Sequence, residues 1–250
     1  MKLYKTLTVS FAATIIIILL SNNLFAQGVW NRKPSNLKVL PDTVDTQKLR
    51  VMMMGFTSAL GVRCEYCHDD SKGSEFNDID FPSDAKKTKD VARVMMKMVQ
   101  TINGDFLKQA NQIDKLDAGV TCVTCHHGNA HVQSLSDVLL GVYNKSGIDS
   151  TFSEYNKLKQ RFYGGFTYDF RENSLVEVGF NILQSKKYDD AIKILEFNST
   201  MYPDSWRNLE TLGEAYLGKD DKAKAKECFE KSLAINPRNR RLQQTLDKLK

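Results

Sequence analysis

The chain has 250 residues, of which 42% are hydrophobic and 26% are charged, and its formal net charge is +5. This length allows one or two domains with cores of ordinary size. Residues 27–150 carry equal numbers of basic and acidic side chains, so most of the surplus lies in the C-terminal hundred residues. A surplus this small is not typical of proteins that bind DNA or RNA, and we expect no nucleic-acid partner.

Residues 1–26 have the features of a secretory signal peptide. Lys2 and Lys5 are followed by an apolar run from Val9 to Leu20, and Ala26 is the small residue that a cleavage site needs. The run is short for a membrane span, which favours a cleaved signal over a retained anchor. We therefore expect export to the periplasm.

The first predicted helix follows an extended stretch, residues 27–42, which contains two prolines. Asp42 or Thr43 is suited to the N-cap position, and Gly61 is suited to ending the helix. Between them, apolar residues recur at helical spacing. This stripe consists of Leu49, Met52 or Met53, Phe56 and Leu60.

A second amphipathic helix is predicted after a polar loop, residues 69–82. Ser83 is the expected N-cap, and Asn103-Gly104 is the expected end. A shorter amphipathic segment then leads to residue 116. The apolar face of the second helix consists of Val91, Met95, Met98 and Ile102.

Each helical region is followed by one copy of the motif Cys-x-x-Cys-His, at Cys64–His68 and at Cys122–His126. This motif is typical of covalent haem attachment. Its two thiols add to the haem vinyl groups, and the adjacent imidazole takes one axial position on the iron. Export agrees with this interpretation, because c-type attachment is completed outside the cytoplasm.

Two other interpretations of the paired cysteines are weaker. A four-thiolate zinc site would not require a histidine directly after each pair. A pair of redox disulfides would be expected in a β-α-β context, and we find no strand pattern in this sequence. The fifth cysteine, Cys228, is left outside the motifs, and we expect it to be a small buried side chain on a helix.

Methionines on both helices are candidate distal ligands. Met52, Met53 and Met54 are consecutive and point about 100° apart, so at most one of them faces a given iron. Met53 lies on the apolar stripe and Met54 points away from it. Met95 lies on the apolar face of the second helix. Gap filling in a core is the commoner role of methionine, and periodicity alone does not exclude it.

Residues 37–128 resemble the N-terminal two-haem half of the cytochrome c subunit of photosynthetic reaction centres. The matching segments are MMGFTSALGVRCEYCH at 53–68, KDVARVMMKMVQTIN at 89–103 and GVTCVTCHHG at 119–128. In that family each haem follows a helix that carries its distal methionine. The resemblance therefore implies two covalently bound haem c groups. Cys64, Cys67, His68 and Met53 would hold the first, and Cys122, Cys125, His126 and Met95 the second.

The chain also departs from this family. Family members have four haems, whereas two motifs are present here. Gln109 stands near the position of the histidine that ligates the fourth haem, and His127 replaces an arginine after the second motif. His131 is an alternative to Met95 as distal ligand, but we favour a surface or propionate contact for it. The resemblance supports a two-haem module and does not support photosynthesis.

The C-terminal region contains an internal repeat. Gly179, Ala191, Leu195 and Pro203 recur 34 residues later as Gly213, Ala225, Phe229 and Pro237. This period and residue set resemble tetratricopeptide repeats, which are pairs of antiparallel helices. Two repeats need neighbours to stack on. Residues 239–250 and a helix around residues 152–162 are candidates for that role.

These observations predict an all-α protein with two parts. A small two-haem cytochrome module, in which a helix precedes each Cys-x-x-Cys-His, occupies residues 27–150. Residues 151–172 form a linker helix and hinge, and Ser134 with Asp137 is expected to cap the helix that precedes it. Residues 173–250 form two tetratricopeptide-like repeats with a C-terminal capping helix.

Electron transfer between periplasmic redox proteins is the leading functional prediction, because two haems on one short chain form a relay and His/Met ligation gives a relatively high potential. A dihaem peroxidase is the enzymatic alternative, and it would need an open axial position on one iron. A third possibility is a haem-bearing adaptor whose repeats bind a protein partner. We expect an electron carrier rather than an enzyme.

Overall fold

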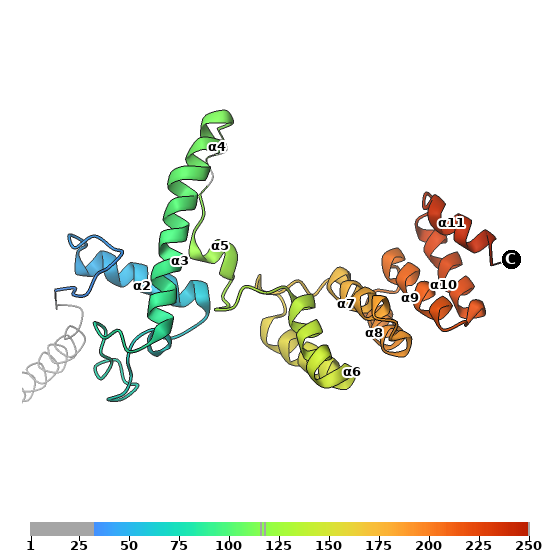
Figure 1. Cartoon of the computed structure of the whole chain (residues 1–250), viewed down its shortest axis with the longest axis horizontal. Coiled ribbons are helices and arrows are strands. Elements are labelled where there is room, and N and C mark those ends of the chain that lie inside the picture. The colour runs from blue at the N-terminus through green and yellow to red at the C-terminus, as the bar shows by residue number, and fades with distance from the viewer. Residues whose placement is uncertain (1–32, 116, 118, 250) are drawn as a thin grey trace, which may run out of the picture. The chain divides into compact units, whose positions relative to one another are not determined.

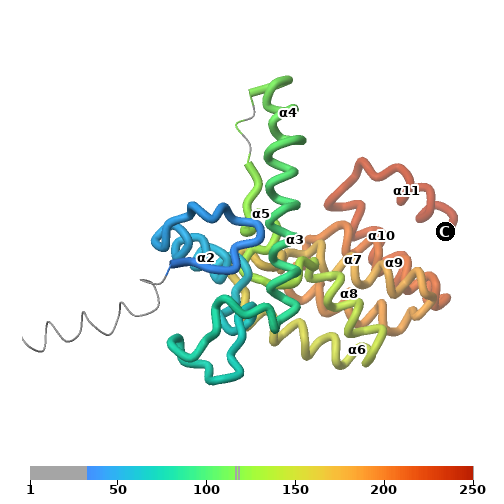
Figure 2. Tube along the Cα trace, turned by 60° about the vertical axis from the view of Figure 1, so that its left-hand side comes forward, coloured from blue at the N-terminus to red at the C-terminus, as the bar shows by residue number. Residues whose placement is uncertain are grey.

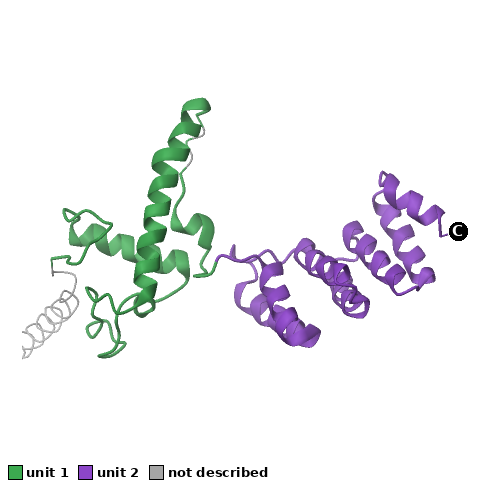
Figure 3. Cartoon of the chain, viewed as in Figure 1, with its two compact units in different colours: residues 1–131 green, residues 132–250 purple. Residues whose placement is uncertain are grey.

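The computed structural model describes residues 33–115, 117 and 119–249. The chain divides into two compact units, residues 1–131 and residues 132–250 (Figure 3). The predicted signal peptide, residues 1–26, lies outside the described residues. In the described part of the chain, no helix has both the length and the hydropathy that a membrane span requires.

Helix α2, Thr46–Leu60, is the first described helix of unit 1. Its N-cap is Asp45, three residues beyond Asp42, because the side chain of Asp45 accepts a hydrogen bond from the backbone N–H of Lys48. Gly61 ends the helix in the left-handed conformation, with φ 63°, as the sequence predicts.

The second helical region is longer than predicted. Helix α3, Lys87–Thr101, continues through a π-helical turn, Ile102–Leu107, into α4, Lys108–Ile113, and these segments follow one another along a single rod (Figures 1 and 2). The prediction that Asn103-Gly104 ends the helix is wrong. The side chain of Asn103 is hydrogen bonded to the backbone of Val120, so it does not cap the helix.

The predicted start of this helix at Ser83 is also wrong. The hydroxyl of Ser83 donates to Asp69 Oδ2 and accepts from the N–H of Ala85, which places Ser83 in the preceding loop. That loop contains an isolated antiparallel bridge between Asp69 and Asp80. The first residue of α3 is therefore Lys87.

Unit 2 begins with α6, Leu135–Phe162, whose start has the predicted capping box of Ser134 and Asp137. The helix is kinked at Gly147, where φ is 78°. The predicted boundary after residue 150 falls inside α6, whereas the two units divide after His131. Helix α6 therefore belongs to unit 2.

Four helices after α6 form two antiparallel hairpins. They are α7, Glu172–Gln184, and α8, Tyr188–Met201, then α9, Trp206–Gly218, and α10, Lys222–Ile235. A Cβ at Gly179 would lie 2.5 Å from Leu195 Cδ2, and one at Gly213 would lie 2.4 Å from Phe229 Cε1. Both helix pairs therefore meet over a glycine, which explains the 34-residue spacing.

Helix α11, Arg240–Asp247, packs on α10 through Leu242 and Leu246 and covers the end of the repeats. Cys228 is buried in the same core, as expected. The described residues are helical apart from loops and the isolated bridge, which confirms the all-α prediction.

The two units differ in their apolar cores. Among the described residues, the buried hydrophobic side chains of unit 1 are Ala59 and Ile79, and all the others belong to unit 2. Several large apolar side chains of unit 1 are exposed instead. They include Val51, Met54, Val91, Val94, Met98 and Phe106. Unit 1 alone therefore buries too little apolar surface for an ordinary domain.

Candidate haem site

The first motif lies on a short 3-10 turn, Cys64–Tyr66, directly after α2. The backbone N–H of His68 donates to Cys64 O at 3.0 Å, which closes the motif on itself. The two residues between the cysteines are held by the start of α3. Lys86 Nζ donates to the carbonyl of Glu65, and Thr88 Oγ1 donates to that of Tyr66 at 2.6 Å.

His68 is oriented by the polar loop. Its Nδ1 lies 3.0 Å from the carbonyl oxygen of Phe81, and because a carbonyl only accepts, Nδ1 carries the proton and Nε2 is left with its lone pair. Burial lowers the pKa of His68, and Lys89 and Arg93 lower it further. A neutral imidazole with Nδ1 bound to a carbonyl is the form in which histidine ligates metals.

The second motif forms α5, Cys122–His126, which begins at a capping box between Thr121 and Thr124. His126 repeats the arrangement of His68, because its Nδ1 lies 2.9 Å from the carbonyl oxygen of Asn129. The backbone that leads into this helix is held by the π-helical turn that follows α3. Asn103 donates to Val120 O at 2.7 Å and accepts from Val120 N at 2.8 Å.

A close backbone contact joins the two motifs. The N–H of Gly128 donates to the carbonyl of Ala59 at 2.9 Å, near the end of α2. A Cβ at Gly61 would lie 2.0 Å from the carbonyl oxygen of Gly128, so only glycine fits there. Gly61 precedes Cys64 by three residues and Gly128 follows His126 by two, and this contact therefore sets how the motifs lie relative to each other.

A cavity of about 430 Å³ is lined by residues of both motifs. His68 and His126 reach it, as do the two predicted distal methionines, Met53 and Met95. Arg93 and His131 also line this cavity. The other walls are largely apolar and come from residues 37–40, α2 and α3. They include Leu37, Val39, Leu40, Phe56, Leu60 and Ala92.

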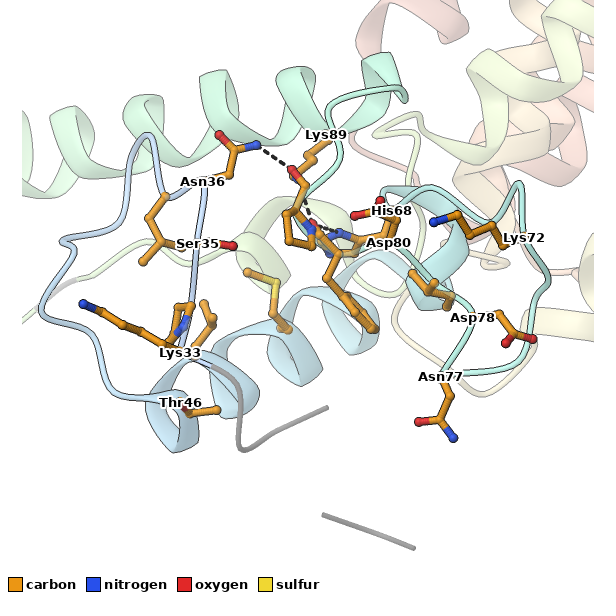
Figure 4. A pocket seen from close by; sticks show the side chains of 17 residues that line it. Lys33, Ser35, Asn36, Thr46, His68, Lys72, Asn77, Asp78, Asp80 and Lys89 are labelled. Carbon is orange, nitrogen blue, oxygen red and sulfur yellow. Dashed lines mark hydrogen bonds between the residues drawn. The ribbon is translucent and has the colours of Figure 1, made fainter. Parts of the chain in front are cut away.

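A second cavity, of about 500 Å³, lies beside the loop that orients His68 (Figure 4). Met53 and His68 line it as well, together with Lys89 and Phe81. Polar residues of the loop form much of its wall. They include Lys72, Asn77, Asp78 and Asp80, all labelled in Figure 4.

The candidate methionines of α2 and α3 differ in their exposure and in the cavities that they line. Met53 lines both cavities, whereas Met54 is 58% exposed, as the helical period predicts. On α3, Met95 lines the shared cavity, but Met96 lines it too and Met98 is 40% exposed. Met98, which the sequence places on the apolar face of this helix, is therefore not buried. The cavity covers a wide arc of α3, so two consecutive side chains about 100° apart both reach it.

These residues fit a haem. The cavity combines apolar walls with the thiol, imidazole and thioether side chains that bind a haem and its iron. It also lies in the unit that lacks an apolar core of its own, which a large planar apolar group would complete. Within the described residues, no three side chains of His, Cys, Asp or Glu come together as a group that could hold a metal ion.

Comparison with known proteins gives the same result. Residues 72–136 match the family model of the photosynthetic reaction centre cytochrome C subunit, and residues 206–239 match that of the tetratricopeptide repeat. The predicted resemblance is confirmed. The first match contains Cys122–His126, and a cytochrome c segment implies covalently bound haem c.

Two curated relatives match part of the chain. Cytochrome c-554 of Chloroflexus aurantiacus is 33% identical over 92 residues, which are 37% of this chain and 20% of the relative. The photosynthetic reaction center cytochrome c subunit of Roseobacter denitrificans is 36% identical over 100 residues, which are 40% of this chain and 25% of the relative. This chain thus spans at most a quarter of the length of these relatives.

Three contacts of the site were not predicted from the sequence: Lys89 with the loop, Asn103 with Val120, and Gly61 with Gly128. Gly61 was assigned only a capping role, which is confirmed. The recurrence of glycine just before the first motif and just after the second was the available signal for a close approach.

Proposed function

We propose that the chain is an exported dihaem c-type cytochrome that transfers electrons between periplasmic redox proteins. The observation that supports this most is the single cavity reached by both motif histidines and by both predicted distal methionines. When bound, each haem supplies an iron that accepts and releases one electron.

The chain would hold the two haems with equivalent sets of residues. Two thioethers from each motif fix the porphyrin, at Cys64 and Cys67 and at Cys122 and Cys125. His68 and Met53 are the proposed axial ligands of the first iron, and His126 and Met95 those of the second. The apolar walls exclude water, and His/Met ligation favours the reduced iron and hence a relatively high potential.

Electron carriage is favoured over the peroxidase alternative by the same cavity. A peroxidase needs an axial position that is open to peroxide and polar groups above it. Here Met53 and Met95 line the same largely apolar cavity as His68 and His126, which supports a methionine as the second axial ligand. We therefore propose no catalytic residues.

The repeats are proposed to bind a protein partner. Residues 206–239 match a repeat family, and tetratricopeptide arrays present extended concave surfaces. Basic residues near the C-terminus could bind an acidic partner, but Arg241 is already paired within unit 2. Its Nη2 lies 3.0 Å from Glu210 Oε1 and 3.0 Å from Glu214 Oε1. The adaptor function and electron transfer are compatible with each other.

Electron transfer and partner binding are tested on the full chain and on a chain that ends at His131, the first by redox titration and the second by capture of a periplasmic partner. For the full chain we expect two one-electron steps with His/Met optical spectra. The shorter chain contains the whole of unit 1, so both steps should persist at the same potentials, whereas capture of a periplasmic partner should be lost.

Each outcome of this comparison is informative. Absence of a one-electron step in the full chain would exclude electron transfer. Capture of the same partner by the shorter chain would exclude recruitment by the repeats. Loss of haem from the shorter chain alone would mean that unit 2 is needed structurally.

A further inference from the structure

Lys89 is held against the loop that orients His68. Its Nζ donates to three consecutive carbonyls, those of Phe81 at 2.9 Å, Pro82 at 3.0 Å and Ser83 at 2.7 Å. Its side chain is only 13% exposed and lines both cavities. Three carbonyl acceptors use all three ammonium hydrogens, so the charge is fixed in place.

One of these carbonyls is shared with the histidine. Phe81 O accepts from Lys89 Nζ at 2.9 Å and from His68 Nδ1 at 3.0 Å (Figure 4). The ammonium group and the imidazole are therefore bound to the same oxygen atom. The Phe81 ring also packs on His68, with centroids 5.0 Å apart, which holds that oxygen and the imidazole together.

This arrangement has a predictable electrostatic effect. A cation on the carbonyl withdraws electron density from it, so the carbonyl is a poorer acceptor for the histidine N–H and the imidazole is a poorer electron donor to a bound iron. A fixed positive charge in an apolar cavity also destabilises ferric iron, which carries one more positive charge than ferrous iron. Both effects raise the reduction potential.

Neighbouring charges reduce this effect only in part. Asp84 Oδ1 lies 3.4 Å from Lys89 Nζ, but the same carboxylate also binds Arg93 at 2.7 Å and Lys38 at 2.6 Å. One carboxylate is thus shared by three cations, of which Arg93 has a second partner in Asp90. The cluster keeps a positive charge.

We infer that Lys89 is a positioning residue that raises the reduction potential of the haem bound by His68, acting through the shared carbonyl of Phe81. This inference rests on the proposed haem binding and adds to it a determinant of the potential. It also implies that Asp84 has the opposite effect, because removing its charge leaves the ammonium group less compensated.

The test is a redox titration of haem-loaded variants of the full chain. Lys89→Met should lower the reduction potential of one of the two one-electron steps. The expected change is about tenfold in the ratio of oxidised to reduced iron at a given potential, or roughly 59 mV. Lys89→Arg keeps the charge, so its potential should stay close to that of the unmodified protein. Asp84→Asn should move the same step to higher potential.

Two controls separate this inference from structural damage and from the proposed function. Lys38→Met removes another cation from Asp84 without touching Phe81 O and should shift the step much less. The thioether-to-iron absorption should persist in every variant. The role of Lys89 would be overturned if Lys89→Met caused no shift, or if Lys38→Met shifted the potential equally. It would also be overturned if Lys89→Met and Asp84→Asn shifted the potential in the same direction. Absence of haem from the unmodified protein would instead contradict the proposed function.

If Lys89→Met does not take up haem, Lys89→Arg and Asp84→Asn test whether Lys89 raises the potential. Asp84→Asn should then still raise the potential, and Lys89→Arg should leave it unchanged. A lowered potential in Asp84→Asn would overturn the inference.

Discussion

Met53→Ala should remove the thioether-to-iron absorption of one haem and lower its reduction potential by roughly 100 mV or more, well within the ~0.8 V that axial ligands span. Met53 lines both cavities together with His68, and it is the proposed distal ligand of the first haem iron. Loss of a thioether ligand favours ferric iron, because thioether ligation raises the potential. Optical titration of the purified protein measures both effects.

Met54→Ala is the matched control for this change. It removes the same atoms from the next residue of the same helix, but Met54 is 58% exposed. Its spectrum and both potentials should match those of the unmodified protein. Equal behaviour of the two variants would show that Met53 is not a ligand, even if two haems are bound.

Gly61→Ala should disrupt the relation between the two haem motifs. The new Cβ would lie 2.0 Å from the carbonyl oxygen of Gly128, and the residue would have to keep a φ of 63°. The left-handed conformation alone costs alanine about 1–2 kcal/mol, and the clash forces the backbone of one motif away from the other. We expect a lower unfolding midpoint, reduced haem loading and changes in both one-electron steps.

Gly55→Ala provides the comparison, because Gly55 lies within α2 and no atom lies within 4 Å of a Cβ built there. Alanine in a helix interior is favoured over glycine by roughly 0.5–1 kcal/mol, so this variant should be slightly more stable than the unmodified protein. Normal haem loading and unchanged potentials in Gly61→Ala would mean that the contact with Gly128 does not set the arrangement of the motifs.

Local sequence signals predicted the parts of the structure that depend on local contacts. The capping box of Ser134 and Asp137, the end of α2 at Gly61 and the outward direction of Met54 are all confirmed. Each of them depends on residues within one or two helical turns. The repeat hairpins were also predictable, because Gly179 and Gly213 are required by close contact with α8 and α10.

Long-range contacts explain where the sequence-based predictions were wrong. Ser83 has the composition of an N-cap, but its hydroxyl is bound to Asp69 in the loop. Asn103-Gly104 has the composition of a helix end, but Asn103 binds Val120 and the helix continues. In both cases a partner 14 or 17 residues away determines the role of the side chain.

The contact of Lys89 with Phe81 could not be predicted for the same reason. His68 Nδ1 and Lys89 Nζ share one backbone carbonyl, that of Phe81, and a backbone carbonyl carries no sequence signal of its own. Only the path of the loop places Phe81 O between the motif and α3. The identities of the thiols and imidazoles were evident in the sequence, whereas the groups that orient them were not.

The intact mass of the exported protein, measured after denaturation together with haem staining of a denaturing gel, tests the central claim most directly. Thioether bonds survive denaturation, so we predict a single stained species whose mass equals that of the polypeptide without residues 1–26 plus two haems. Cys122→Ser with Cys125→Ser should lose one haem and keep the other. A mass equal to that of the bare polypeptide, or of the polypeptide with zinc or with one haem, would contradict the account.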